Sequence, residues 1–124
     1  LAKPDHKVIC CVGDGAYIFG VPTAVHYVSR AYRLPVLFIV FTNGYWNASR
    51  QTAFNYAPDG YAARAKSVPL CEIKPSVAYE KICQAAGGYG ERVTNPAELP
   101  EAIERALAVI ESENRQALLN VICR

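Results

Sequence analysis

Two polar breaks that follow apolar runs are the first candidates for chemistry in this chain. The run Val8–Val12 stops at Gly13-Asp14-Gly15, which places a carboxylate between two glycines, and a second apolar run stops at a turn that carries the Asn43 amide. Carboxylate, amide and backbone carbonyl oxygens suit a hard cation such as Mg²⁺, which is typically held by one or two carboxylates together with substrate phosphates. Glycines let backbone N–H groups turn toward a phosphate. These residues therefore predict a site for a metal ion and a phosphorylated ligand.

The elements around the two breaks predict how they are brought together. The runs Val8–Val12 and Val36–Phe41 have the composition of buried strands, and a helical pattern between them starts near Pro22 and ends before Leu34-Pro35. Such a βαβ unit places both breaks at the carboxyl ends of neighbouring parallel strands, where open α/β sheets bind ligands. Because the first run is apolar on both faces, we expect a central strand. Residues 13–20 predict a glycine-punctuated turn.

The rest of the chain continues to alternate helix and strand. We expect a three-layer α/β/α domain with a parallel sheet. The last helix is capped by Asn95, with Pro96 at its first position, and its apolar stripe is Leu99, Ile103, Leu107 and Ile110. The remaining predicted elements are a short helix over Ala48–Asn55, a turn at Ala57–Gly60, one helical turn at Tyr61–Arg64, a helix from Ser76 to Ala86, a short strand at Glu91–Val93 and a closing strand over Ala117–Cys123.

Composition limits the classes of protein to consider. The chain has 124 residues, the size of one domain, with 52% hydrophobic and 19% charged residues, which excludes a disordered chain. A net charge of +2 does not favour a nucleic-acid partner, and no apolar run is long enough to span a membrane. The five cysteines lack metal-binding spacing and indicate a reducing, cytoplasmic compartment. The chain begins at Leu1 and contains no methionine, which indicates a fragment.

Other phosphate-binding motifs fit less well. A dinucleotide-binding Gly-x-Gly-x-x-Gly sequence would need glycine at Ile18, and no acidic residue occurs between Asp14 and Asp59 to bind a ribose. A Walker loop is excluded because Gly-Lys-Ser/Thr is missing. The same stretch carries Arg30, Arg33 and Arg50, a positive bias compatible with an anionic ligand.

The spacing of the two breaks resembles a known family. Asp14 and Asn43 are 29 residues apart (43 − 14), and Gly-Asp-Gly followed by an Asn-bearing turn after the next strand resembles the thiamine diphosphate enzymes. Leu34-Pro35-Val36 and Ala117–Val121 are similar to the acetolactate synthase and 2-oxo acid decarboxylase branch. Thr42 stands where that family usually has a first Asn, and Ala16 where it often has Ser.

The resemblance implies a role for each residue of the two breaks. Asp14, Asn43 and the carbonyl of Tyr45 would hold Mg²⁺, and the backbone N–H groups of Gly15 and Ala16 would face the diphosphate. The cofactor-binding set it implies is Gly13, Asp14, Gly15, Ala16, Asn43, Tyr45 and Trp46.

Single residues in and near this set admit more than one interpretation. Trp46 is open to two, core packing or a wall of the cofactor site or a subunit interface, whereas His26 is interpreted as structural. If Asp14 and Asn43 hold Mg²⁺, Asp14→Ala should abolish cofactor retention in the full-length enzyme. We expect its fold to survive, because an exposed carboxylate of a turn contributes little to a core.

The resemblance also implies a fold and an activity. It implies a flavodoxin-like C-terminal diphosphate-binding domain over residues 1–124 that lacks its first strand and helix. The whole enzyme would use thiamine diphosphate and Mg²⁺ to act on 2-oxo acids, by decarboxylation or carboligation, as a homo-oligomer. A pyrimidine-binding domain of a second subunit would supply the catalytic glutamate, and no proton-transfer residue is assigned in this chain. The alternative is a non-catalytic α/β binding or interaction module that has lost the cofactor.

Overall fold

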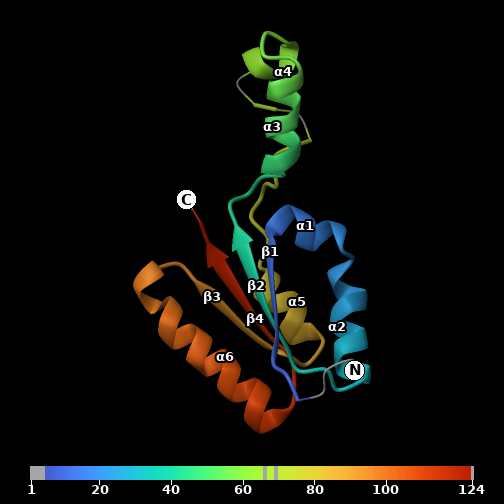
Figure 1. The fold of residues 1–124 in the computed structure, drawn as a ribbon, viewed down its shortest axis with the longest axis vertical. Helices are drawn as coiled ribbons and strands as arrows, with labels where there is room; N and C mark the ends of the chain where they lie inside the picture. The colour runs from blue at the N-terminus through green and yellow to red at the C-terminus, as the bar shows by residue number, and fades with distance from the viewer. Residues whose placement is uncertain (1–4, 66, 69, 124) are drawn as a thin grey trace.

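Four parallel strands form one sheet in the computed structural model, which describes residues 5–65, 67–68 and 70–123. The strands lie in the order β1-β2-β4-β3, and every neighbouring pair is parallel (Figure 1). Their bounds are β1 (Val8–Gly13), β2 (Val36–Thr42), β3 (Tyr89–Val93) and β4 (Ala117–Ile122). The parallel sheet predicted from the sequence is confirmed.

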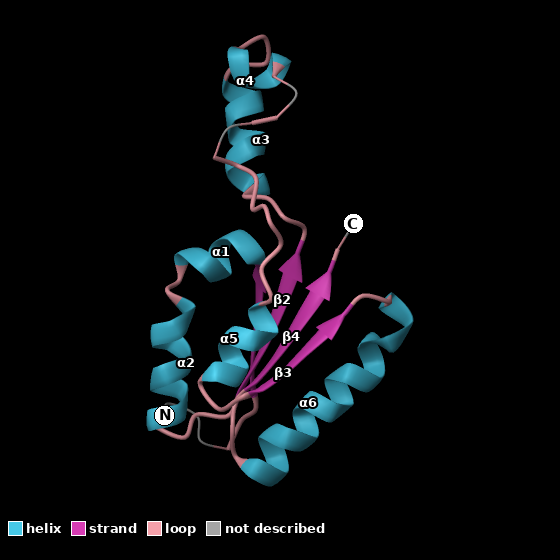
Figure 2. Cartoon of the chain, turned by 180° about the vertical axis from the view of Figure 1, so that it is seen from behind, coloured by secondary structure: helices cyan, strands magenta, loops and turns pink. Residues whose placement is uncertain are grey.

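Helices cover both faces of the sheet. The helices α1 (Asp14–Phe19), α2 (Pro22–Ala31) and α5 (Tyr79–Ala85) lie on one face, and α6 (Leu99–Glu113) lies on the other (Figures 1 and 2). The helices α3 (Asn47–Tyr56) and α4 (Tyr61–Arg64) project beyond the carboxyl ends of the strands and bury no side chain. We call residues 47–70 the arm. The sheet with its two helical layers is the predicted α/β/α architecture.

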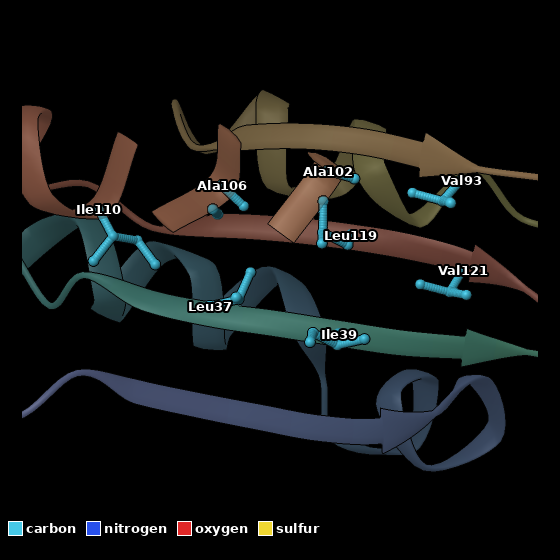
Figure 3. Close-up of a cluster of buried hydrophobic side chains, with 9 residues drawn as sticks. Leu37, Ile39, Val93, Ala102, Ala106, Ile110, Leu119 and Val121 are labelled. Atoms are coloured by element: carbon cyan, nitrogen blue, oxygen red, sulfur yellow. The ribbon is translucent and has the colours of Figure 1, made fainter. Parts of the chain in front are cut away.

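Two apolar cores sandwich the sheet. On the α6 side, Ala102 and Ala106 are fully buried against Leu37 and Leu119, because their small side chains let the helix lie close to the strands (Figure 3). The predicted stripe of larger residues flanks these alanines, and of its members Ile110 is buried, whereas Leu99, Ile103 and Leu107 are partly buried. The second core contains Tyr17, Phe38, Val40, Tyr79, Cys83 and Leu118. Each large apolar side chain so buried contributes about 1.5–3 kcal/mol by leaving water.

Three local predictions differ from the structure. Residues 13–20 contain helix α1 rather than a turn, because Gly13 takes an ordinary extended conformation (φ −75°, ψ 154°) and the helix begins directly at Asp14. Ser76 does not cap α5, which begins at the fully buried Tyr79 after Ala78 in a non-helical conformation. Asn95 caps a 3₁₀ turn over Pro96–Glu98, through its side chain and the Ala97 N–H, before α6 starts.

The predicted central position of the first strand is wrong for this chain. β1 pairs only with β2 and forms an edge of the sheet, so Val8 and Ile9 are each about half exposed (50% and 51%). On the neighbouring helix α2, Val25 and Val28 are exposed as well. The apolar character of β1 therefore does not correspond to burial by the elements described here.

Candidate functional site

The two polar breaks meet at the carboxyl edge of the sheet, as the sequence predicted. β1 and β2 are adjacent and parallel, with Gly13 opposite Phe41 in the register. Asp14, the first residue of α1, is only 1% exposed. Its Oδ1 accepts a hydrogen bond from the Gly15 N–H (3.0 Å) and its Oδ2 accepts one from the Gly44 N–H (2.8 Å). The carboxylate is thus buried and joins the end of β1 to the turn after β2, which contradicts the expectation of an exposed carboxylate.

The turn after β2 presents oxygen atoms beside this carboxylate. Gly44 has a φ of 76°, a left-handed conformation that favours glycine, and its carbonyl accepts a hydrogen bond from the Ile73 N–H (2.8 Å). Asn43 folds its side chain back, so that Oδ1 accepts from the Tyr45 N–H (2.9 Å). Because each amide or carboxylate oxygen has two lone pairs, Asn43 and Asp14 keep capacity to bind a cation.

Trp46 lies against the glycine that follows Asp14. A Cβ atom at Gly15 would be 2.4 Å from Cδ1 of the Trp46 ring, whereas a Cβ at Gly13 would meet no atom within 4 Å. Gly15 is therefore required for close approach of the indole, and Gly13 is not. The backbone N–H of Trp46 donates to the Cys71 carbonyl (2.9 Å), and Trp46 is half-buried. Trp46 belongs to neither buried core, and its interpretation as a wall of the cofactor site or a subunit interface stays a prediction.

A cavity of about 680 Å³ opens at this edge, within the size range of small-molecule sites, about 300–1,000 Å³. All seven residues of the predicted cofactor-binding set line it: Gly13, Asp14, Gly15, Ala16, Asn43, Tyr45 and Trp46. Its other lining residues, which lie outside the predicted set, are Phe19, Asn47, Ala48, Ser49 and Leu70, and of these the sequence pointed only to Asn47, as the end of the turn after β2. They come from the end of α1 and from the arm, where no local motif marks a residue as facing the cavity.

Two basic residues, Arg50 of the arm and Lys74, lie over the Tyr45 ring. The Arg50 guanidinium lies 5.4 Å from the centroid of the Tyr45 ring and 5.1 Å from that of Phe54, and the Lys74 ammonium lies 5.6 Å from Tyr45. Such cation–π contacts contribute about 0.5–1 kcal/mol each at exposed positions. Arg50 is therefore close to the cavity.

A chain of buried polar side chains supports the end of β2. The Thr42 hydroxyl donates to Oδ1 of Asn120 (2.6 Å), and Nδ2 of Asn120 donates to Oε2 of Glu80 (2.7 Å). All three residues are buried. The sequence analysis did not identify this network, although a single Asn within the apolar strand Ala117–Ile122 was a usable signal. The network fixes the residue that precedes Asn43.

His26 joins α1, α2 and the start of β4. The side-chain amide of Gln116 donates through Nε2 to the His26 carbonyl (2.9 Å). Its oxygen, Oε1, therefore accepts a hydrogen bond from Nδ1 of His26 (2.6 Å). The imidazole then accepts at Nε2 from the Tyr17 hydroxyl (2.7 Å). Burial lowers the pKa of His26, which favours this neutral form. The structural interpretation of His26 agrees with these contacts.

Tyr79 is the one buried side chain whose polar atom lacks a partner among the described residues. Its hydroxyl is enclosed behind the site, and its ring packs edge-on against Tyr17 at a centroid distance of 5.3 Å. Burial, with a smaller effect of the Asp14 charge, raises the pKa of Tyr79 to about 12. The hydroxyl is therefore neutral in the functional pH range.

The donor set at this edge favours a hard cation. Within the described residues, no three His, Cys, Asp or Glu side chains come together as a metal site. The available ligands are the Asp14 carboxylate, the Asn43 amide and backbone carbonyls, which are oxygen donors of the kind Mg²⁺ prefers. A bound phosphate would complete such a coordination shell.

Comparison with known proteins agrees with this geometry. Residues 1–121 match the family model described as thiamine pyrophosphate enzyme, C-terminal TPP binding domain. An acetolactate synthase large subunit of Mycobacterium tuberculosis is 33% identical over 108 residues, which cover 87% of this chain and 18% of that protein. A 2-hydroxyacyl-CoA lyase of Oryza sativa subsp. japonica is 32% identical over 127 residues, which cover 98% of this chain and 20% of that protein.

A solved structure shows the same fold. The benzoylformate decarboxylase of Polynucleobacter necessarius superposes with a TM-score of 0.72 at 19% identity, over 98% of this chain and 20% of that one. The chain therefore spans about a fifth of the length of the relatives that it matches.

Proposed function

We propose a function from one premise: the chain belongs to the thiamine pyrophosphate enzyme family, as its C-terminal TPP-binding domain. The cavity at the carboxyl edge anchors the diphosphate of thiamine diphosphate through Mg²⁺. The observation that carries this proposal is the convergence of all seven residues of the predicted set on one cavity. The buried, doubly hydrogen-bonded carboxylate of Asp14 lies at its floor.

Each residue has a distinct part in this proposal. Asp14, Asn43 and the Tyr45 carbonyl hold the metal ion, and the N–H group of Ala16 faces the diphosphate at the start of α1. The Gly15 N–H, which was predicted to face the diphosphate as well, donates to Oδ1 of Asp14. The N–H groups of Gly15 and Gly44 fix the Asp14 carboxylate before any ligand binds. A ligand atom held in a fixed position loses less entropy on binding, so this preorganisation favours tight anchoring. Gly13 and Trp46 form walls of the cavity.

The chain contributes anchoring and orientation rather than proton transfer. When bound, thiamine diphosphate supplies an electron sink for breaking the bond next to the carbonyl of a 2-oxo acid. The residues around the cavity keep the diphosphate end fixed, so the reactive end is oriented toward the substrate. Among the described lining residues, Asp14 is the only carboxylate, and it is assigned to the metal.

The complete protein is proposed to be an acetolactate synthase-like enzyme that acts on 2-oxo acids by decarboxylation or carboligation. The named relatives support this class. We further propose a homo-oligomer in which the pyrimidine-binding domain of a second subunit completes the cofactor site. The half-exposed apolar residues of β1 support a domain that lacks its first strand and helix.

We propose a cytoplasmic location from the state of the cysteines. All five cysteines are free in the structure, which supports the proposed cytoplasmic location. None of the described helices combines the length and the apolar character needed to cross a membrane.

Cofactor titration tests the proposal. Calorimetric titration of the complete protein with thiamine diphosphate should show saturable binding in Mg²⁺ and at least roughly a hundredfold weaker binding in EDTA, because the metal joins the diphosphate to Asp14. Saturable binding that is independent of metal would refute anchoring through Mg²⁺, and no binding at all would support the non-catalytic module that has lost the cofactor. The 124-residue chain alone should show no turnover of pyruvate or benzoylformate, since the pyrimidine side of the cofactor is not provided.

A further inference from the structure

A second cavity, of about 630 Å³, lies at the opposite, amino edge of the sheet. It is formed where α2, α5 and α6 all end (Figure 2). Its lining residues are Ser29, Arg30, Arg33, Ala86, Gly87, Glu113, Asn114, Arg115 and Gln116. It shares no lining residue with the cavity at the carboxyl edge, so it does not belong to the proposed cofactor site.

The lining of this cavity is positively charged. Three guanidinium groups and the Glu113 carboxylate give it a formal charge of +2 (3 − 1). Arg115 pairs with Glu113 (2.7 Å) and donates to the Gly87 carbonyl (3.3 Å). Arg30 donates through Nη1 to the Ala86 carbonyl (3.1 Å). Arg30 and Arg33, grouped with Arg50 in the sequence analysis, thus lie away from the carboxyl edge.

The Arg30 guanidinium packs directly against the backbone of Gly87. A Cβ atom at Gly87 would be 1.6 Å from Nη1 of Arg30, so only glycine leaves room for the guanidinium there. Gly87 is also in the left-handed conformation (φ 79°) that ends α5. Since one N–H of Arg30 bonds to the Ala86 carbonyl, its remaining N–H groups are available to a ligand.

Arg33 stands at a position where glycine is usual. The Leu34 N–H bonds to the Ser29 carbonyl (2.8 Å) and the Arg33 N–H bonds to the Arg30 carbonyl (3.2 Å), which is the Schellman pattern at the end of α2. Arg33 occupies the left-handed position of this motif with φ 52°, which is unfavourable for a residue with a Cβ atom. Within the described residues, its side chain has no hydrogen bond or ion pair that offsets this strain.

We infer that this cavity binds a phosphorylated small molecule, with its phosphate group between Arg30 and Arg33. Guanidinium groups match phosphate oxygens in bidentate geometry, and Arg115 adds charge at the back of the cavity. If the arginines served only to neutralise the negative ends of the helices, glycine at position 33 would relieve the backbone strain at φ 52° and lose only one of three guanidinium groups. The inference is independent of the proposed cofactor function.

An adjoining cavity accommodates the organic part of such a ligand. It has a volume of about 750 Å³ and shares Arg30 and Ala86 with the cavity at the amino edge. Tyr27, which is 71% exposed, and Ile82 provide aromatic and aliphatic surface beside Arg30. An aromatic ring next to a guanidinium pair suits a nucleoside monophosphate better than a purely inorganic anion.

Two probes and three variants test the inference. Inorganic phosphate and AMP are titrated by calorimetry in EDTA, so that no metal-dependent site takes part. Both should bind saturably, and Arg33→Gly should weaken both roughly tenfold or more, because a charge-assisted contact to phosphate is lost. The melting temperature of Arg33→Gly should stay unchanged or rise, because glycine suits φ 52°. Arg92→Gln, which removes an exposed arginine of β3, is the matched control and should bind as wild type.

The comparison of the probes identifies the ligand class. Tighter binding of AMP that Tyr27→Ala removes, with phosphate binding kept, supports an organic phosphate, and equal binding supports recognition of the phosphate group alone. Absence of saturable binding of both probes to the wild-type protein overturns the inference. Unchanged binding in a folded Arg33→Gly variant overturns it as well, since the arginines would then serve only the helix ends.

Discussion

Replacing Asp14 separates its structural part from its proposed metal-binding part. The carboxylate is 1% exposed and accepts hydrogen bonds from the N–H groups of Gly15 and Gly44. Asp14→Ala removes both acceptors. Asp14→Asn keeps an amide oxygen that can accept from Gly44 but loses the negative charge. The two variants should therefore differ in stability and agree in metal binding.

The structure sets the expected magnitudes. A hydrogen bond to a charged group contributes about 1.5–3 kcal/mol. Removing the buried carboxylate also removes the cost of burying its charge, which offsets part of the lost hydrogen-bond energy. We expect Asp14→Ala to lower the free energy of unfolding of this domain by about 2 kcal/mol, and so to lower its melting temperature. Asp14→Asn should lose about 1 kcal/mol or less. Both should weaken Mg²⁺-dependent cofactor binding by more than about a hundredfold, since even outer-shell partners of metal ligands typically contribute 10–100-fold.

Two measurements on the complete protein check this reasoning. Thermal unfolding in EDTA reports stability without metal, and calorimetric titration with thiamine diphosphate in Mg²⁺ reports anchoring. Unchanged cofactor affinity in a folded Asp14→Asn variant would refute the metal assignment. Equal melting temperatures of Asp14→Ala and wild type would refute the structural contribution of the buried carboxylate.

Three further perturbations follow from single contacts. Gly15→Ala should displace Trp46, the only tryptophan, shift its fluorescence and weaken cofactor binding, because the new Cβ would be 2.4 Å from the indole. Gly13→Ala, whose Cβ would meet no protein atom within 4 Å, is the control for the indole contact and should leave the fluorescence unchanged. Burial lowers the pKa of His26, so the unfolded chain takes up a proton first as the pH falls below about 6.5. Urea unfolding should therefore show stability lost as the pH falls below about 6.5, and a His26→Gln variant should show a smaller loss. Tyr79→Phe removes a buried hydroxyl that lacks a described partner, so its free energy of unfolding should rise by up to about 1–2 kcal/mol; a marked fall in thermal stability would show that the hydroxyl has a partner.

The sequence predicted the carboxyl edge well because its signals are local. An apolar strand followed by a polar break is read directly from residues 8–15 and 36–47, and parallel connection places such breaks together without further information. The end of α5 was predictable for the same reason. Gly87 and Gly88 form the two hydrogen bonds of a Schellman motif, to the carbonyls of Gln84 and Cys83.

The parts that could not be predicted depend on contacts between distant residues. The strand order, with β4 inserted between β2 and β3, has no local signal. Asp14 was expected to be exposed, and its burial depends on Gly44, thirty residues away. The apolar composition of β1 predicted a central strand, but which strands pair with it is not encoded in that composition, and β1 lies at an edge of the sheet.

The proposed metal site depends on strand register as much as on its ligands. Asp14 follows β1 and Asn43 follows β2, so a slip of one residue between the strands would move the two oxygen donors by about 3.3 Å relative to each other, more than a metal–oxygen bond length. Register between parallel strands is specified by which side chains face each core. In β2, Leu37 and Ile39 face α6 while Phe38 and Val40 face the layer of α1, α2 and α5, and Thr42 is held by Asn120 of the next strand. The buried cores and the Thr42–Asn120 hydrogen bond therefore fix the distance between the two ligands, and substitutions there should alter metal binding without touching the site.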